Sequence, residues 1–99
     1  MPSKRPLREV RLALDRRASV AGRRQATELC ARYGPDAIPA DMLTAAELAF
    51  KHATGRALRD SRVEGNPEVL LTNLIEVWHA SFVVELGRQR RARDGAPKS

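Results

Sequence analysis

The sequence predicts an all-α fold, a small helical bundle of three to four helices that ends in a long C-terminal helix. Apolar residues recur every three or four positions through much of the chain, which is the period of one helix face, and period-two alternation is absent. Gly34-Pro35 and Asn66-Pro67 are typical of a helix end and a helix start. The 99 residues, 42% of them apolar, suffice for one hydrophobic core but not for two.

The first helical block is expected from about Leu7 to Tyr33. Gly22 and a candidate N-cap at Ser19 leave two interpretations open, one long helix or two shorter helices with a break between them. The end is better defined, because Gly34 suits the left-handed position after a helix and Pro35 cannot continue one. The apolar positions of this block share one face: Leu7, Val10, Leu14, Ala18 and Ala21.

The second block has two candidate starts. The segment Thr44-Ala45-Ala46-Glu47 has the spacing of a capping box, whereas Pro39 suits a first helical turn and would place the start near Ala40. Gly55 either ends this helix or lies inside it. The apolar face comprises Leu43, Ala46, Ala49, Phe50 and Ala53.

The third block has the best-defined start, with Asn66 as N-cap, Pro67 at the first helical position and Glu68 in the first turn. A helix from Pro67 to Arg93 spans about 40 Å at 1.5 Å per residue, more than the width of a small domain. One apolar stripe consists of Leu71, Ile75, Trp78 and Phe82, and a second consists of Leu70, Leu74, Val77 and Val84. Either both stripes are buried in a monomer, or the second stripe forms the interface of a homodimer.

Charge is segregated along the chain, whose net charge is +6. Residues 1–33 carry nine basic and three acidic side chains, residues 34–87 carry four and eight, and the last twelve residues carry five and one. We expect a flexible basic N-terminus at residues 1–6, a single α-helical domain at residues 7–93 and a flexible tail at residues 94–99. Cationic ends fit either an anionic partner or an acidic protein surface, including another copy of the chain.

Two functions follow from this charge pattern. The first is a DNA-associated protein, regulatory or architectural, that holds duplex through phosphate contacts, since few aromatic residues remain outside the apolar stripes to stack on unpaired bases. The second is a helical interaction or assembly module, such as an adaptor or a virus-like structural subunit, with no nucleic-acid binding. The predicted nucleic-acid contacts are Arg8, Arg11, Arg16, Arg23, Arg24, Arg88, Arg90, Arg91 and Arg93.

No arrangement of residues predicts catalysis, a cofactor or a small-molecule substrate. Glu76 and His79 have the Glu-x-x-His spacing of di-metal bundles, but one pair lacks the further carboxylates of such a site. We therefore expect no metal, a partly buried His79 beside Trp78, and a solvated Glu76. Arg16-Arg17-Ala18-Ser19 resembles a kinase acceptor motif, in which we expect Ser19 to act only as a cap.

The lone cysteine, Cys30, allows no internal disulfide, so the cytoplasm is the expected location. Arg32 lies close in sequence and would lower a thiol pKa, but no partner motif accompanies it, and we expect Cys30 to be a small buried residue. His52 is expected on the surface. No run approaches the roughly 18 uncharged residues of a membrane span, so no membrane association is predicted.

Overall fold

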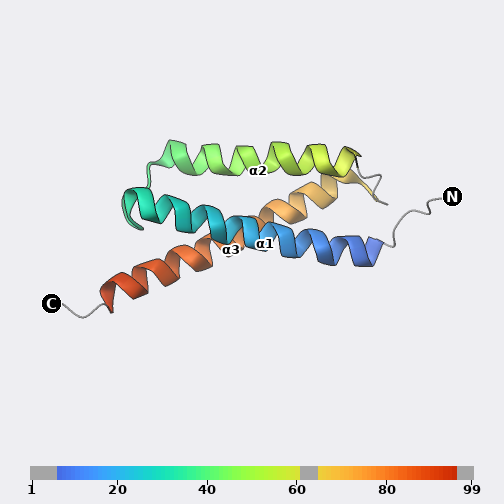
Figure 1. The fold of residues 1–99 in the computed structure, drawn as a ribbon. Helices are drawn as coiled ribbons and strands as arrows, with labels where there is room; N and C mark the ends of the chain where they lie inside the picture. The colour runs from blue at the N-terminus through green and yellow to red at the C-terminus, as the bar shows by residue number, and fades with distance from the viewer. Residues whose placement is uncertain (1–6, 61–64, 96–99) are drawn as a thin grey trace.

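The computed structural model describes residues 7–60 and 65–95, which form three α-helices. They are α1 (Leu7–Tyr33), α2 (Ala40–Asp60) and α3 (Pro67–Asp94). In Figure 1, α1 and α3 run in the same general direction and cross near their middles, while α2 returns in the opposite direction. The predicted all-α class is confirmed, and the C-terminal helix is long, at 28 residues. The predicted flexible segment 1–6 and residues 96–99 of the predicted tail lie outside the described residues, whereas Asp94 still belongs to α3.

α1 is one continuous helix, which decides between the two interpretations of the first block. Gly22 does not interrupt it; the residue lies where α1 crosses α3. A Cβ atom at this position would lie 2.3 Å from the carbonyl oxygen of Trp78 and 3.2 Å from the backbone nitrogen of Phe82. The glycine is therefore needed because the two helix backbones approach each other closely there.

The predicted end of α1 and the predicted start of α3 are confirmed. Gly34 adopts a left-handed φ of 85°, and its N–H donates to the carbonyl of Cys30 at 2.8 Å, which ends α1 at Tyr33. At the start of α3, the Asn66 side chain accepts a hydrogen bond from the backbone N–H of Glu68 at 2.9 Å. Both ends are determined by residues that are adjacent in the sequence.

α2 begins at Ala40, the earlier of its two predicted starts. The backbone N–H of Met42 donates to the carbonyl of Pro39 at 3.0 Å, so the first turn forms ahead of the capping-box sequence. The Thr44 hydroxyl donates instead to the Ala40 carbonyl at 3.1 Å, as a hydroxyl inside a helix does. Gly55 lies within α2 and is buried.

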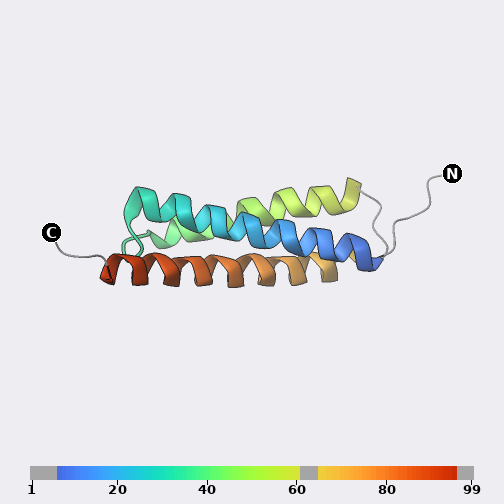
Figure 2. The same ribbon diagram turned by 60° about the horizontal axis from the view of Figure 1, so that its bottom comes forward.

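The core centres on Trp78, which is 3% exposed. Its ring stacks on Phe50 of α2 with centroids 5.7 Å apart and contacts Phe82 at 5.3 Å. α3 packs mainly on α1 and less extensively on α2, and Figure 2 shows α1 and α3 side by side. The buried stripe of α3 combines members of both predicted stripes: Leu70, Leu74, Trp78, Phe82 and Glu85.

Two of the four residues predicted for an oligomer interface are buried by this packing. Leu70 and Leu74 are 6% and 2% exposed within the single chain, so they are not available to a second copy in this fold. Val77 is half-buried and Val84 is 63% exposed. The four residues therefore range from the buried stripe of α3 to its exposed edge.

Within residues 7–60 and 65–95, α3 is the one helix that is long and apolar enough to cross a membrane, judged by length and composition alone. The mean hydropathy of its most apolar window is 1.4, and 28% of that window is buried in the fold. Core helices of proteins outside membranes meet the same criterion. Here its buried apolar residues form the centre of the bundle.

Candidate nucleic-acid interface

Four arginines of α1 are exposed, and one of them, Arg23, also lines the groove between α1 and α3. Arg16 and Arg23 are separated by two helical turns, as are Arg17 and Arg24, so each pair is aligned along the helix about 10.5 Å apart. Ala18, Gly22 and Ala26 of the same helix are buried. We call the four residues the α1 arginine face; in the described part of the chain, no carboxylate forms an ion pair with any of them.

The α1 arginine face differs in two respects from the set predicted from sequence. Arg17 was not in that set, although its seven-residue spacing from Arg24 was visible in the sequence. Arg11 is exposed, but at 100° per residue it lies more than 100° around the helix from both Arg16 and Arg17. Arg8 lies in α1, and its side chain is outside the described part of the structure.

Three of the four predicted C-terminal arginines, Arg88, Arg90 and Arg93, form ion pairs within the chain. Arg90 Nε lies 3.0 Å from Asp36 Oδ1, and a second nitrogen of Arg90 donates to the Pro35 carbonyl at 3.2 Å. Arg93 also pairs with Asp36, and its Nη2 lies 3.0 Å from Asp94 Oδ1. These contacts join the end of α3 to the α1–α2 loop. Arg91 is exposed and forms no ion pair with any described residue.

Glu85 is the one buried charged residue among those the structure describes, at 5% exposure. Its carboxylate accepts hydrogen bonds from Arg88 at 3.2 Å and from Gln89 at 2.9 Å. Sequence reasoning missed this residue, although it follows Phe82 by three positions and Trp78 by seven and so lies on the core stripe. Arg88, predicted as a phosphate contact, therefore also compensates a buried charge.

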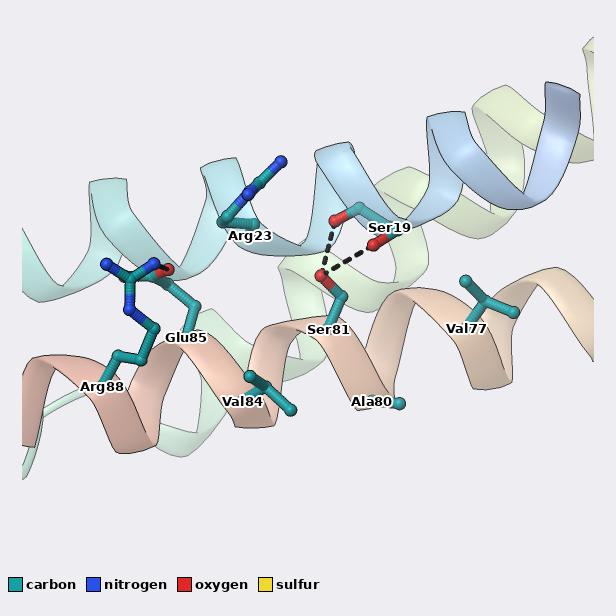
Figure 3. Close-up of a pocket in the computed structure, with 8 residues that line it drawn as sticks. All are labelled: Ser19, Arg23, Val77, Ala80, Ser81, Val84, Glu85 and Arg88. Carbon is teal, nitrogen blue, oxygen red and sulfur yellow. Dashed lines mark hydrogen bonds and ion pairs between the residues drawn. The ribbon is translucent and has the colours of Figure 1, made fainter.

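Arg23 of α1 and the Glu85–Arg88 pair of α3 line a groove between the two helices (Figure 3). At its centre the Ser81 hydroxyl donates to the Ser19 carbonyl at 2.5 Å, and the Ser19 hydroxyl lies 3.3 Å from that of Ser81. Ser19 is therefore an interhelical contact in mid-helix, and the prediction that it caps a helix is wrong. The groove is lined by Ser19, Arg23, Val77, Ala80, Ser81, Val84, Glu85 and Arg88.

Cys30 is buried, as predicted, at the α1–α3 contact. Burial raises the pKa of its thiol above the usual value of 9.0, the negative charge of Glu85 raises it further, and Arg90 opposes the rise. The predicted neighbour Arg32 is not among the groups that shift this pKa. A thiol in this environment is protonated at neutral pH and is a poor nucleophile.

The wild type should lose stability at alkaline pH because of the Cys30 thiol, and Cys30→Ala should lack this contribution to the loss. The folded-state pKa is raised, so the contribution of the thiol is fully present below the unfolded-state pKa and declines as pH rises through the folded-state pKa. Urea unfolding from neutral pH to above pH 9.0 should show the free energy of unfolding of the wild type falling more steeply than that of Cys30→Ala. Parallel pH profiles would contradict a raised thiol pKa.

The other residues considered as metal ligands or catalytic groups do not come together in one site. Among the described residues, no group of three or more His, Cys, Asp or Glu side chains is placed to hold a metal ion. His79 is exposed rather than partly buried, with its ring 6.4 Å from that of Trp78, and Glu76 is exposed, as predicted. His52 is exposed, as predicted.

No protein-family model, curated protein or solved structure matches this chain. Its function therefore has to be inferred from the arrangement of its own residues.

Proposed function

We propose that this chain binds the phosphate backbone of duplex nucleic acid through the α1 arginine face. The observation that carries the proposal is the alignment of four exposed arginines in two lines along one helix, with no carboxylate partner in the described part of the chain. Guanidinium groups bind phosphates as bidentate donors, and they remain charged at any physiological pH.

The spacing of the arginines suits a polyanion better than a single small anion. Over a 10.5 Å length of helix axis a DNA duplex presents about six phosphate charges, so two aligned pairs of arginines can be matched along it. The described fold is elongated, at 63 × 25 × 18 Å, and α1 follows its long direction (Figure 2). The α1 arginine face is therefore able to lie along a duplex.

The aromatic residues favour a duplex over unpaired bases. Trp78 and Phe82 are buried, Phe50 packs on Trp78, and Tyr33 is half-buried against the core. Single-strand binding relies on exposed aromatic rings on which bases stack. Binding through phosphate contacts needs no exposed aromatic ring, so it fits this surface better than base stacking does.

Arg90, Arg91 and Arg93 supply a second cationic surface. The side chains of Arg90 and Arg93 remain 48% and 47% exposed in their ion pairs with Asp36. Exposed ion pairs contribute only about 0–1 kcal/mol each, so a phosphate is able to compete for these arginines. We propose that they add affinity after α1 has engaged the duplex.

The double variant Arg16→Gln/Arg24→Gln should bind mixed-sequence duplex DNA more weakly and with less dependence on salt. Each lost phosphate contact lowers the magnitude of the slope of log affinity against log salt by about 0.9, so a reduction of about two is expected. Fluorescence anisotropy of a labelled duplex over a series of salt concentrations measures both the affinity and the slope.

Arg56→Gln/Arg59→Gln is the matched control, because it removes the same charge from exposed positions of α2. It should leave the slope close to that of the wild type. Equal effects of the two double variants would mean that net charge, and not the α1 arginine face, governs binding. A wild-type chain that fails to bind duplex even at low salt would refute the proposal.

A second candidate function, a helical interaction module without nucleic-acid binding, is favoured by one specific observation. Large apolar side chains are exposed on α3, with Val69 at 55%, Val83 at 51% and Val84 at 63%. For this function the α1 arginine face would contact an acidic protein surface. The salt titration with duplex separates the two candidates, because only the first predicts binding to DNA.

A further inference from the structure

We infer that the exposed side of α3 pairs with the same side of a second copy of the chain, with the two α3 helices antiparallel. We call this surface the α3 outer face; its central residues are Val77, Ala80, Val84 and Gly87, of which Ala80 and Val84 are exposed and the other two are half-buried. It is adjacent to the buried stripe of α3 but separate from it, so the fold of each copy remains as described. This inference does not depend on nucleic-acid binding.

The spacing along the α3 outer face is that of a helix-pairing seam. Steps of three, four and three residues separate its central positions, as at the a and d positions of a heptad. Val84 is 63% exposed, and Val83, at the edge of the face, is 51% exposed. Burying such side chains against another helix removes apolar surface from water, which favours association. Figure 3 shows Val77, Ala80 and Val84 along one edge of the α1–α3 groove.

Gly87 is not required by the packing of its own chain. A Cβ atom at this position would meet only the terminal Arg91 Nη1 at 3.3 Å, the end of a flexible side chain. A glycine inside a helix is less favourable than an alanine, and the packing of the single chain does not explain its presence in α3. Gly22 shows the contrast, because a backbone carbonyl of α3 occupies the space of its Cβ. A second helix packed close to Gly87 would account for this glycine, as the close approach of α3 accounts for Gly22.

The charges beside the α3 outer face determine the orientation of the pair. At the N-terminal end of the α3 outer face, Glu76 of α3 and Glu47 of α2 line one groove. Neither carboxylate forms an ion pair with any described residue. Arg88 and Arg91 lie at its C-terminal end. An antiparallel pair brings the acidic end of each copy opposite the basic end of the other, whereas a parallel pair places like charges together.

The antiparallel arrangement also matches large side chains to small ones. With Ala80 of one copy opposite Val84 of the other, Val77 comes opposite Gly87, and the two-fold axis passes close to Val83. A two-fold pair presents the same surface from both copies, as closed dimers do. It would also give the assembly two α1 arginine faces, one from each copy, with Arg23 of each next to the paired helices because it lines the same groove as Val77, Ala80 and Val84.

Sedimentation equilibrium of the full chain tests the pairing. The wild type should show twice the 11.0 kDa of one chain at high concentration, and Val84→Asp should show the single-chain mass with an unchanged far-UV circular dichroism spectrum. Leu48→Asp is the matched control, because Leu48 is 48% exposed on α2, and it should remain dimeric. A monomeric wild type, or equal dissociation of both variants, would overturn the inference.

Gly87→Leu separates association from folding. The substitution raises helix propensity, so the single chain should be at least as stable as the wild type, yet the dimer dissociation constant should rise at least tenfold because the side chain fills the space of the second helix. Unchanged association of this variant would show that nothing approaches Gly87, and the inference would fail.

Cysteine cross-linking tests the orientation. Val83→Cys lies near the two-fold axis of an antiparallel pair, so oxidation should link two copies through this position. Val69→Cys is equally exposed, at 55% in the wild-type residue, but lies far from its counterpart in that arrangement and should stay unlinked. Cross-linking through Val69→Cys and not through Val83→Cys would contradict the antiparallel pair.

Discussion

Trp78→Ala is expected to lower the free energy of unfolding by about 3–5 kcal/mol, the usual cost of removing a large aromatic side chain from a core. Trp78 is 3% exposed and contacts aromatic rings on α2 and on its own helix. Domains of this size are stable by only about 5–15 kcal/mol, so the variant should be largely unfolded or close to it at room temperature. The substitution would remove the ring contact between α3 and Phe50 of α2.

Far-UV circular dichroism is the appropriate measurement, because Trp78 is the single tryptophan and its own fluorescence is lost in the variant. Trp78→Phe is the control, since it keeps a ring between Phe50 and Phe82 and should retain most of the helicity. If Trp78→Ala unfolded at the same urea concentration as the wild type, Trp78 would not be the centre of the core.

Gly22→Ala should also destabilise the fold, although alanine favours a helix. The new Cβ atom would lie 2.3 Å from the Trp78 carbonyl oxygen and 3.1 Å from its carbon, and neither backbone atom can turn away. α1 and α3 must therefore separate, which costs about 1–3 kcal/mol or more for an overpacked contact and exceeds the roughly 1 kcal/mol gained in helix propensity. For a domain of this size a net loss of 1 kcal/mol lowers the melting temperature by about 4–8 °C.

Gly55→Ala provides a control of opposite sign. A Cβ atom there would lie 3.6 Å from Leu71 Cδ2, an ordinary van der Waals distance, so the gain in helix propensity should dominate. Thermal unfolding should place the melting temperature of Gly22→Ala below that of the wild type and that of Gly55→Ala above it. Two stabilised variants would mean that α1 and α3 do not cross closely at Gly22.

Local sequence determined the helical class and most of the helix ends. Gly34 and Asn66 could be assigned from sequence because a left-handed glycine and an N-cap side chain act on backbone groups within four residues. The burial of Cys30 and the exposure of His52 also agreed with the pattern of neighbouring residues. The exposed arginines of α1 followed in part, since Arg16, Arg23 and Arg24 were named and Arg17 was not.

Only the tertiary structure decided which side of each helix is buried. α3 is apolar on more than one side, so its sequence pattern allowed two stripes, and contact with α1 and α2 selected a stripe that includes Leu70, Leu74 and the charged Glu85. The helix crossing likewise decided that Gly22 is a contact and not a break. The ion pairs of Arg90 and Arg93 with Asp36 join residues more than fifty positions apart. Periodicity describes one helix at a time, whereas burial and charge pairing depend on which helices meet.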